Sequence, residues 1–297
     1  MKILLTGIHG QVGSAISRRL PSYATVLAPP RSELDLADLV AVRKWMHQEQ
    51  PDLVINAAAY TAVDKAEQEP DVAFLLNAEL PHCLSQCLAE WQGALVHYST
   101  DYVFDGTRIQ GGYTEDEPPH PLGIYGKSKR QGEVLLMESE TPALIFRTSW
   151  VYSLHGRNFL KTMLKLGQER DELRIVNDQW GAPTWAGSIA EATIAVLQKV
   201  LTDGLPVNAA VRPYSGLYHM TNGGSTSWYG FTQRIFERCR YTTHLVPILS
   251  AEYPSPVIRP ANSRLDNGKL ARTFEVRLPD WEVALDQCLS GLSGNSE

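Results

Sequence analysis

Tyr125 and Lys129 are the two residues of this sequence whose spacing most directly suggests chemistry. Four residues apart, they would stack on one face of a helix. A free phenol has a pKa near 10, so a tyrosine is a good proton shuttle at neutral pH only when a nearby cation favours the phenolate. Lys129 would supply that cation. The pair therefore predicts a tyrosine that exchanges a proton with the oxygen of a bound carbonyl compound.

Thr100 is predicted to hydrogen-bond the same oxygen. It closes a short apolar run, residues 94–99, that is typical of a buried strand. Open α/β sheets bind ligands at the carboxyl ends of parallel strands, where Thr100 would lie. A Tyr-x-x-x-Lys pattern is common by chance. Its weight here comes from the order of three features: a glycine-rich turn, then Thr100, then the tyrosine and lysine.

The glycine-rich turn contains Gly7, Gly10 and Gly13 and directly follows the apolar run 2–6. In a nucleotide-binding unit, the first glycine allows the tight turn, the second the close approach of a pyrophosphate, and the third the packing of the next helix. The N-terminus of that helix would offer free N–H groups to phosphate. An ordinary strand–helix turn is the alternative, because the glycines are spaced three and three rather than two and three.

Arg31 stands near the end of the second predicted strand, where sites specific for NAD usually place an acidic residue. A guanidinium there can bind a 2′-phosphate through two hydrogen bonds, which favours NADPH over NADH. A solvated loop arginine is the alternative. Asp35 and Leu36 could flank an adenine ring, although Asp35 could equally cap the helix that follows.

The elements that must position these residues alternate along the first half of the chain. Short apolar runs predict buried strands at residues 2–6, 25–28, 53–56, 94–99 and 143–147. Residues 37–50 and 72–91 show helical spacing of their apolar side chains. This β-α-β alternation predicts an α/β fold, a Rossmann-type doubly wound parallel sheet that runs through about residue 150.

The second half is less regular and predicts a smaller lobe. Helices are expected at 158–170, 188–200 and 227–238, a strand at 217–221, a loop at 203–216, and a proline-rich tail at 247–260. We therefore expect a nucleotide-binding domain over 1–150, with later segments returning to it at about 177–215. Residues 151–297 would form mainly a discontinuous substrate-binding lobe.

Composition excludes several classes of protein. Of the 297 residues, 43% are hydrophobic, which argues against disorder, and the net charge of −6 without a basic run argues against nucleic acid as a partner. The apolar runs are too short for a signal peptide or a membrane span, so a soluble cytoplasmic protein is expected. The four cysteines lack the paired spacing of metal ligands and are expected as reduced, mostly buried thiols: Cys83, Cys87, Cys239 and Cys288.

Several longer motifs carry a resemblance to a known family. They are GQVG (10–13), NAAAYTAVDKAE (56–67), HYSTDYVFDG (97–106), YGK (125–127), FRTSWVY (146–152), NDQ (177–179) with GAPT (181–184), and RPANSRL (259–265). Over nearly its whole length the sequence resembles the extended short-chain dehydrogenases/reductases and, more narrowly, the dTDP-4-dehydrorhamnose reductase family. The last three groups of motifs are the specific ones, because the nucleotide-binding motifs belong to the wider superfamily.

The resemblance implies reduction of the 4-keto group of dTDP-4-dehydro-L-rhamnose to dTDP-L-rhamnose by NADPH or NADH, the last step of dTDP-L-rhamnose synthesis. Tyr125 would then be the proton donor, and Lys129 its partner and a ribose ligand. Thr100 and Asp101 would meet the sugar. Trp150, which follows the fifth predicted strand, would form the opposite wall of the sugar pocket.

The resemblance also implies cofactor and substrate contacts elsewhere in the chain. The cofactor residues would be Gly10, Gln11 and Val12 at the pyrophosphate, Asp35 and Leu36 at the adenine side, and Ala59, Tyr60 and Thr61 near the nicotinamide. Arg259 and Asn262 lie in the family's C-terminal substrate motif. Their side chains suit the dTDP diphosphate and nearby groups, but the resemblance does not assign an individual contact to either residue.

One departure from the family concerns a metal ion. Some members hold Mg²⁺ at a dimer interface through a Glu shortly after the Gly-Ala-Pro-Thr segment, but here Gly187 stands at that place. The sequence thus gives no support for a metal-bridged dimer, and a monomer or a homodimer is expected. Glu191 could substitute, or it could be a surface charge.

Two other functions remain open on the sequence. One is a reductase, epimerase or dehydratase for another nucleotide-sugar, such as a different dTDP-hexulose. No Glu follows Asp101 before the loop, which weighs against a dehydratase. The other is a non-catalytic NADP-binding module that resembles the regulatory β subunit of methionine adenosyltransferase. Among the remaining candidates, His97 is expected as a buried structural histidine, and Trp185, Trp228 and Trp281 as core aromatics.

Overall fold

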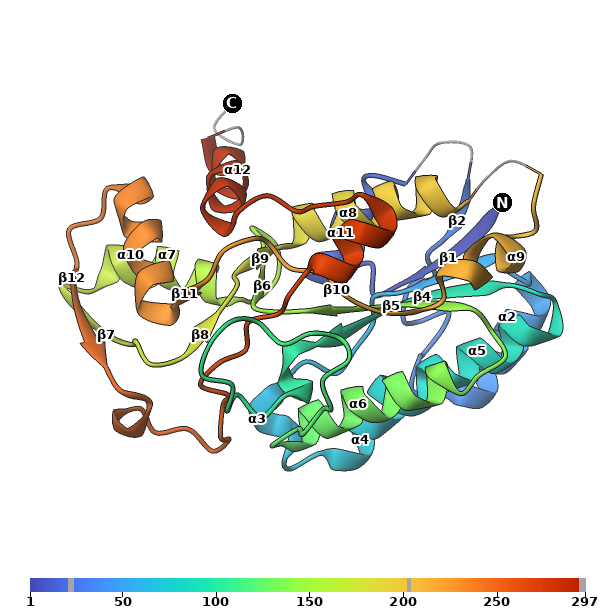
Figure 1. Ribbon diagram of the computed structural model, residues 1–297, viewed down its shortest axis with the longest axis horizontal. Coiled ribbons are helices and arrows are strands. Elements are labelled where there is room, and N and C mark those ends of the chain that lie inside the picture. Colours follow the sequence, from blue (N-terminus) through green and yellow to red (C-terminus); the bar gives the residue numbers. More distant parts are fainter. Residues whose placement is uncertain (21–23, 202–203, 294–297) are drawn as a thin grey trace.

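A six-stranded parallel sheet forms the centre of the molecule in the computed structural model, which describes residues 1–20, 24–201 and 204–293 (Figure 1). The strand order is β10-β5-β4-β3-β1-β2. The strands are β1 (Lys2–Thr6), β2 (Thr25–Leu27), β3 (Leu53–Asn56), β4 (Ala94–Thr100), β5 (Ala143–Thr148) and β10 (Gly216–His219). The predicted doubly wound parallel sheet is confirmed.

Alternate residues of each central strand enter two different cores. Ile3 and Leu5 pack on one face of the sheet, whereas Leu4 packs on the other. Leu4 lies opposite Val54 on β3, whose side chain points to the same face. Burial on both faces explains why these strands read as continuous apolar runs rather than alternating ones.

Helices cover both faces of the sheet, as Figure 1 shows. One face is covered by α2 (Leu39–Glu49), α5 (Leu80–Glu90) and α6 (Ile124–Met137). The opposite face is covered by α1 (Gln11–Ser17), α8 (Ala186–Val200) and α11 (Gly268–Phe274). Two of these three come from the second half of the chain, and β10 joins the sheet beside β5, so the sheet is not completed within the first 150 residues.

A smaller lobe with its own apolar core lies beside the carboxyl ends of the strands. Its helices are α7 (Phe159–Glu169), α10 (Trp228–Cys239) and α12 (Trp281–Ser293), and its longest strands, β7 (Glu172–Val176) and β12 (His244–Ile248), pair in parallel. Shorter elements complete the chain: β6 (Val151–Tyr152), β8 (Trp180–Gly181), β9 (Thr184–Trp185), β11 (Thr226–Ser227), α3 (Val63–Ala66), α4 (Pro70–Phe74) and α9 (Val207–Val211).

The helix predicted over 72–91 is interrupted by a π-helical segment. Between α4 and α5, residues Leu75–Glu79 form a π-helix that ends directly before Pro81 enters the first turn of α5. Pro81 has no N–H to donate to the carbonyl of Asn77, and its ring would collide with that carbonyl in an α-helix. A wider turn relieves the conflict. Apolar spacing alone does not reveal this change, because the path of the chain stays helical.

Two loop predictions in the second half are wrong in part. Within the predicted loop 203–216, Val207–Val211 form α9 and Arg212–Tyr214 a 3₁₀ turn, because Ala210 and Val211 are buried against the sheet. Asp203, at the start of this loop, lies outside the described residues. The predicted tail 247–260 begins as the end of β12, where hydrogen bonding to β7 overrides its proline content.

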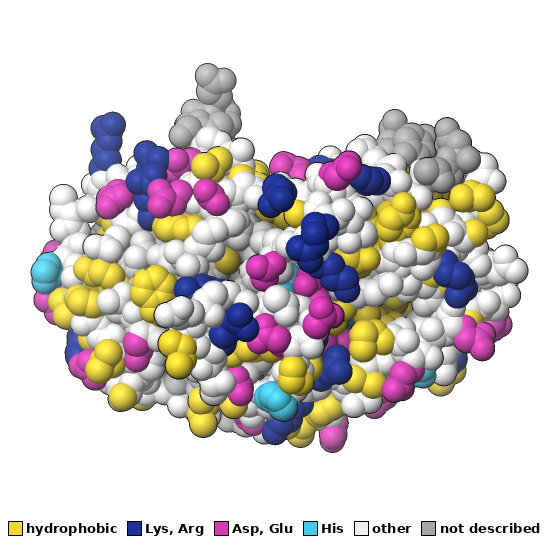
Figure 2. Space-filling model, in the orientation of Figure 1, with side chains coloured by type: hydrophobic (Ala, Val, Ile, Leu, Met, Phe, Trp, Pro, Cys, Tyr) yellow, Lys and Arg dark blue, Asp and Glu magenta, His cyan; other side chains and the backbone are white. Residues whose placement is uncertain are grey.

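The surface mixes acidic and basic side chains across the face shown in Figure 2. Apolar side chains lie scattered among them rather than in one continuous band. In the described part of the chain, no helix combines the length and the apolar character that crossing a lipid bilayer requires.

Candidate active site

The glycine-rich turn brings β1 and α1 into very close contact. Gly7 has φ +68°, a conformation that favours glycine, and its carbonyl accepts a hydrogen bond from the Gly10 N–H at 2.8 Å. A Cβ atom at Gly13 would lie 2.2 Å from the same carbonyl oxygen. The predicted roles of the first and third glycines therefore correspond to real steric limits in this turn.

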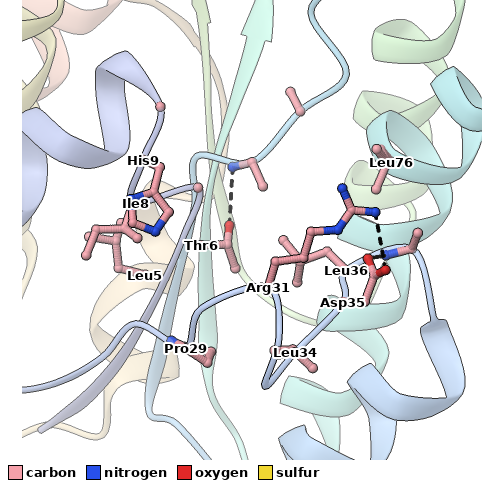
Figure 3. A pocket seen from close by; sticks show the side chains of 15 residues that line it. Leu5, Thr6, Ile8, His9, Pro29, Arg31, Leu34, Asp35, Leu36 and Leu76 are labelled. Carbon is pink, nitrogen blue, oxygen red and sulfur yellow. Dashed lines mark hydrogen bonds and ion pairs between the residues drawn. The ribbon is translucent and has the colours of Figure 1, made fainter. Parts of the chain in front are cut away.

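A cavity of about 260 Å³ opens beside this turn (Figure 3). Its lining unites five of the residues predicted for the pyrophosphate and adenine ends of a dinucleotide: Gly7, Gly10, Arg31, Asp35 and Leu36. Ala59, which was predicted near the nicotinamide, also lines it. Leu34 and Leu76 add apolar surface. An apolar slot beside a glycine turn fits an adenine nucleotide.

Arg31 and Asp35 form an ion pair at the edge of this cavity, with the guanidinium 3.3 Å from the carboxylate (Figure 3). Asp35 also accepts a hydrogen bond from the Ala37 N–H, which is the main cause of the lowered pKa of its carboxyl. Asp35 does not cap the next helix: Asp38 caps α2, accepting from the N–H groups of Val40 and Ala41. The capping alternative for Asp35 is therefore wrong.

Gln11 and Val12 begin α1 but do not line this cavity. The Gln11 amide oxygen accepts from the Asn158 side chain at 2.8 Å, and its amide nitrogen donates to the Val151 carbonyl at 3.3 Å. The Val12 side chain packs on the sheet core. Their predicted contribution to pyrophosphate binding can therefore come only from backbone N–H groups, which lack intrahelical acceptors in a first turn.

The loop of Ala59, Tyr60 and Thr61 is clamped by Asn77 from the π-helical segment. The Asn77 amide accepts from the Tyr60 N–H at 2.9 Å and donates to the Tyr60 carbonyl at 3.0 Å. It also donates to the Ser128 hydroxyl on α6 at 3.0 Å. Asn77 thus connects the predicted nicotinamide loop to the helix that carries Tyr125.

Thr100, Asp101 and Tyr125 meet where β4 ends. The Thr100 hydroxyl donates to the Asp101 carboxylate at 3.1 Å and accepts from the Tyr102 N–H at 3.2 Å. Burial raises the pKa of Asp101 to about 7. Burial also raises the pKa of Tyr125 to about 12, against an opposing hydrogen bond from Thr100. Tyr125 is therefore a neutral phenol at neutral pH.

Lys129 lies on the same helix but does not lower the pKa of Tyr125 as expected. Its Nζ donates to the Tyr98 carbonyl at 2.5 Å and lies 3.2 Å from Nε2 of His97. Burial lowers the pKa of Lys129 to about 8, which still leaves it mainly an ammonium at pH 7. His97 is buried and hydrogen-bonded, as the sequence predicts.

A second cavity, of about 800 Å³, lies between the sheet and the smaller lobe. Two predicted site residues line it, Thr61 and Arg259. Arg259 is 3.3 Å from Asp64, and its buried Nε has no hydrogen-bond partner among the described residues. The cavity extends toward Tyr125 through Tyr102, whose ring meets that of Tyr125 edge to face with centroids 5.7 Å apart.

Trp150 adopts a left-handed conformation with φ +45° and stacks on Trp228, with ring centroids 3.5 Å apart. Trp228, not Trp150, lines the larger cavity, and its indole N–H donates to Gln179 at 3.1 Å. The interpretation of Trp228 as only a core aromatic is therefore incomplete. Of the two residues in this wall, only Gln179 lies in a motif that the sequence analysis singled out. Nothing in the sequence indicated that Trp228 would line a cavity.

Asn262 lies away from the larger cavity and is occupied by the fold. Its amide nitrogen donates to the carbonyls of Arg108 and Gly111, and its oxygen accepts from the backbone and side chain of Arg264. Asn262 therefore fastens the 106–111 loop to the C-terminal segment. The structure does not bring it together with Arg259.

The place of the family's metal ligand is filled by an aromatic ring. A Cβ at Gly187 would lie 2.4 Å from the Trp185 ring, and Glu191 pairs with Arg19 at 2.7 Å. Over the residues that the structure describes, no group of three His, Cys, Asp or Glu side chains could hold a metal ion.

Known proteins resemble this chain over nearly its full length. The family model described as RmlD substrate binding domain matches residues 1–293. A dTDP-4-dehydrorhamnose reductase from Burkholderia thailandensis is 43% identical, covering 98% of this chain and 99% of that protein.

Solved structures extend the likeness to three dimensions. A dTDP-4-dehydrorhamnose reductase from Clostridium acetobutylicum is 34% identical, with a TM-score of 0.90 over 99% of this chain and 100% of that one. A dTDP-4-dehydrorhamnose reductase from Bacillus anthracis, solved in complex with NADP, is 31% identical, with a TM-score of 0.89 over 98% and 99% of the two chains.

Proposed function

The chain belongs to the RmlD substrate binding domain family, and from that membership we propose that it is a dTDP-4-dehydrorhamnose reductase. It would reduce the 4-keto group of dTDP-4-dehydro-L-rhamnose with NADPH or NADH and release dTDP-L-rhamnose. The observation that carries the proposal is the meeting of Thr100, Asp101 and Tyr125 at the end of β4, in contact with Tyr102, which lines a cavity large enough for a nucleotide-sugar.

The first cavity fits the cofactor. Gly7 and Gly10 leave room for a pyrophosphate, and Leu34, Leu36 and Leu76 offer apolar surface to an adenine. Arg31 at the edge supports NADPH as the preferred cofactor, because a guanidinium can bind a 2′-phosphate. When bound, the reduced nicotinamide supplies the hydride for the sugar carbonyl.

Tyr125 would donate the proton that the reduced oxygen needs. Burial keeps its phenol protonated at neutral pH, so the proton is present when the substrate binds. Thr100 would turn its hydroxyl from Asp101 toward the same oxygen and stabilise the negative charge that develops there. Lys129, held at the Tyr98 carbonyl, would bind ribose hydroxyls of the cofactor.

The second cavity would hold the dTDP part of the substrate. Arg259 offers an unpartnered guanidinium nitrogen to the diphosphate, in exchange for part of its ion pair with Asp64. Trp228 and Gln179 supply an aromatic face and an amide that suit a nucleoside base. Trp150 would contribute to this wall by supporting Trp228.

We place the enzyme in the cytoplasm as a monomer or homodimer without a bridging metal. A sugar-nucleotide substrate supports the cytoplasmic location. The absence of a bridging metal is supported by the Trp185 ring, which fills the space where a side chain at position 187 would lie. Molecular mass in solution, measured with Mg²⁺ and with EDTA, tests the second statement. A dimer that dissociates in EDTA would contradict it.

The test of function is the oxidation of NADPH or NADH, followed by absorbance, when the protein meets dTDP-4-dehydro-L-rhamnose. We expect rapid oxidation with dTDP-L-rhamnose as the product, faster with NADPH. Turnover of a different dTDP-hexulose alone would overturn the substrate. Cofactor binding without turnover of any dTDP-hexulose would overturn the enzyme assignment and favour a regulatory NADP-binding subunit.

A further inference from the structure

Lys129 is a buried cation whose contacts in the structure are with uncharged groups. Its side chain is 1% exposed, and its Nζ lies 2.5 Å from the Tyr98 carbonyl and 3.2 Å from Nε2 of His97. The imidazole is neutral, because burial and the charge of Lys129 hold the pKa of His97 well below its usual range. A buried charge is costly unless an opposite charge lies near it. The question is which group supplies that opposite charge.

Glu133 places a carboxylate one helical turn after Lys129. The two residues are four apart on α6, so their side chains share one face of the helix, with Cβ atoms about 5–6 Å apart. This face is turned toward the sheet, because both side chains are buried and both reach groups of β4. Tyr125 lies one turn before Lys129 on the same face.

Four hydrogen bonds hold the Glu133 carboxylate in place. One oxygen accepts from the Ser99 hydroxyl at 2.6 Å and from Nε of Arg147 at 2.7 Å. The other accepts from a second nitrogen of Arg147 at 2.7 Å and from Arg130 at 3.1 Å. Ser99 directly precedes Thr100 in β4, and Arg147 lies opposite Ser99 in β5. The carboxylate therefore fastens α6 to the strand that carries Thr100.

The negative charge of Glu133 is shared between two buried cations. Arg147 is 1% exposed and takes part of the carboxylate's field through its two hydrogen bonds. Burial lowers the pKa of Lys129 to about 8, and the Glu133 carboxylate opposes that fall. Without the carboxylate, Lys129 and Arg147 would be two buried positive charges with no common counter-ion. Lys129 would then lose its proton at a lower pH.

The other charged or titratable groups on elements packed against α6 lie away from Lys129. Asp101 and Tyr102, in the turn after β4, meet Tyr125 in the first turn of the helix. The rest are partly or fully exposed side chains: Asp64, Lys65, Asp71, Glu79, His82, Glu90 and Lys127. Water screens exposed charges, so the field that Lys129 senses comes mainly from Glu133.

We propose that Glu133 is a positioning residue that keeps Lys129 an ammonium one turn from Tyr125 and fastens the helix of both residues to β4. The proposal rests on the proposed function, because the charge matters for catalysis only if Lys129 serves the reaction. An ammonium offers three N–H donors to the ribose of the cofactor and a charge to the phenolate that Tyr125 leaves after giving up its proton. Glu133 is fully buried and acts only through these neighbours.

The direct test is the titration of Lys129 followed by NMR in the ligand-free protein. We would label the lysines with ¹³C and ¹⁵N, assign Lys129 by the signal lost in Lys129→Met, and titrate between about pH 5 and pH 10. In Glu133→Gln, which keeps the size of the side chain and removes its charge, we expect the midpoint to fall by about one pH unit or more. An unchanged midpoint in this variant, folded, overturns the proposal. No substrate is needed, so the result is independent of the reductase activity.

The pH profile of kcat separates the charge from a merely structural role. In Glu133→Gln, the alkaline loss of kcat should begin about one pH unit lower than in the wild type, in step with the NMR midpoint. Glu133→Asp keeps the charge and should keep the wild-type profile, although the shorter side chain lowers stability. Losses of kcat that are equal at every pH in both variants would show a structural role only and overturn the proposal.

The matched control is Glu138→Gln, the same change at the exposed residue that ends the same helix. It should leave the Lys129 midpoint and the pH profile as in the wild type. If Glu133→Gln does not fold, the wild-type midpoint decides, because a buried lysine without a counter-ion can titrate at roughly pH 5–6. A wild-type midpoint above pH 7 then supports the proposal, and one below pH 7 overturns it.

Discussion

Tyr125 is the residue at which binding and chemistry can be separated. Replacing it with phenylalanine removes the proposed proton donor and changes no residue that lines the cofactor cavity. We expect Tyr125→Phe to bind NADPH normally and to lose about 10²–10⁴-fold in kcat, the usual contribution of a general acid. Tyr241→Phe, the same change at a tyrosine of the smaller lobe whose hydroxyl accepts from Gln168, is the control. Retained turnover in Tyr125→Phe would disprove the assignment.

Arg31 tests the choice between the two cofactors. Its guanidinium pairs with Asp35 and is exposed at the cavity edge. If it binds the 2′-phosphate, Arg31→Ala should raise the KM for NADPH by about 10-fold or more, the value of one charge-assisted hydrogen bond, and change the KM for NADH little. Arg18→Ala, at an arginine that bonds to Ser14, is the comparison. Equal losses with both cofactors would refute the role.

Asp101 makes stability depend on pH in a direction that can be worked out. Its pKa rises from 3.8 to about 7 in the fold, so the folded state holds the proton more tightly than the unfolded chain. The cost of ionising it is absent below pH 3.8 and grows as pH rises through about 7. Between pH 5.5 and 8.5, Asp101→Asn should therefore gain about 2 kcal/mol in unfolding free energy relative to wild type. Urea unfolding at both pH values measures it, and a pH-independent difference would contradict it.

At the scale of elements, the π-helical segment Leu75–Glu79 carries a positioning function. Asn77 holds Tyr60 at both its N–H and its carbonyl and also reaches Ser128 on α6. We expect Asn77→Ala to destabilise the fold by about 1–3 kcal/mol, because buried partners lose their bonds. The KM for the cofactor should rise more than kcat falls, since the loop loses its anchor. An unchanged KM for the cofactor would show that the loop holds its shape without Asn77.

The sequence predicts most of the helices and strands but not the places where they depart from regular geometry. Strands such as β1 and β3 were predictable to the residue, because burial on both faces leaves continuous apolar runs. The π-helix was not, because Pro81 forces a wider turn without breaking the helical path. In the site, Tyr125 and Thr100 were predictable from spacing. The wall formed by Trp228 and Gln179 was not, since it depends on two segments that meet only in the folded lobe.

At the scale of the whole molecule, the sheet depends on late segments of the chain. Ile189 and Val196 of α8 and Phe274 of α11 share one core with Ile3 and Leu5 of β1. The division into domains at residue 150 stays a prediction, and a fragment of residues 1–150 tests it. We expect that fragment to bind hydrophobic dyes and unfold without cooperativity, because one face of its sheet is bare. Cooperative unfolding of the fragment would contradict this expectation.

The late arrival of β10 and α11 has a consequence for synthesis on the ribosome. The glycine turn, the cofactor cavity, Thr100 and Tyr125 all leave the ribosome before the strand and helix that complete the sheet beneath them. Nascent chains generally fold domain by domain from the N-terminus as they emerge. We therefore expect the core on this face of the sheet to be completed only after the last quarter of the chain has been synthesised. We expect the uncovered sheet face to be prone to aggregation until these segments emerge, which chaperone binding to the nascent chain would reveal.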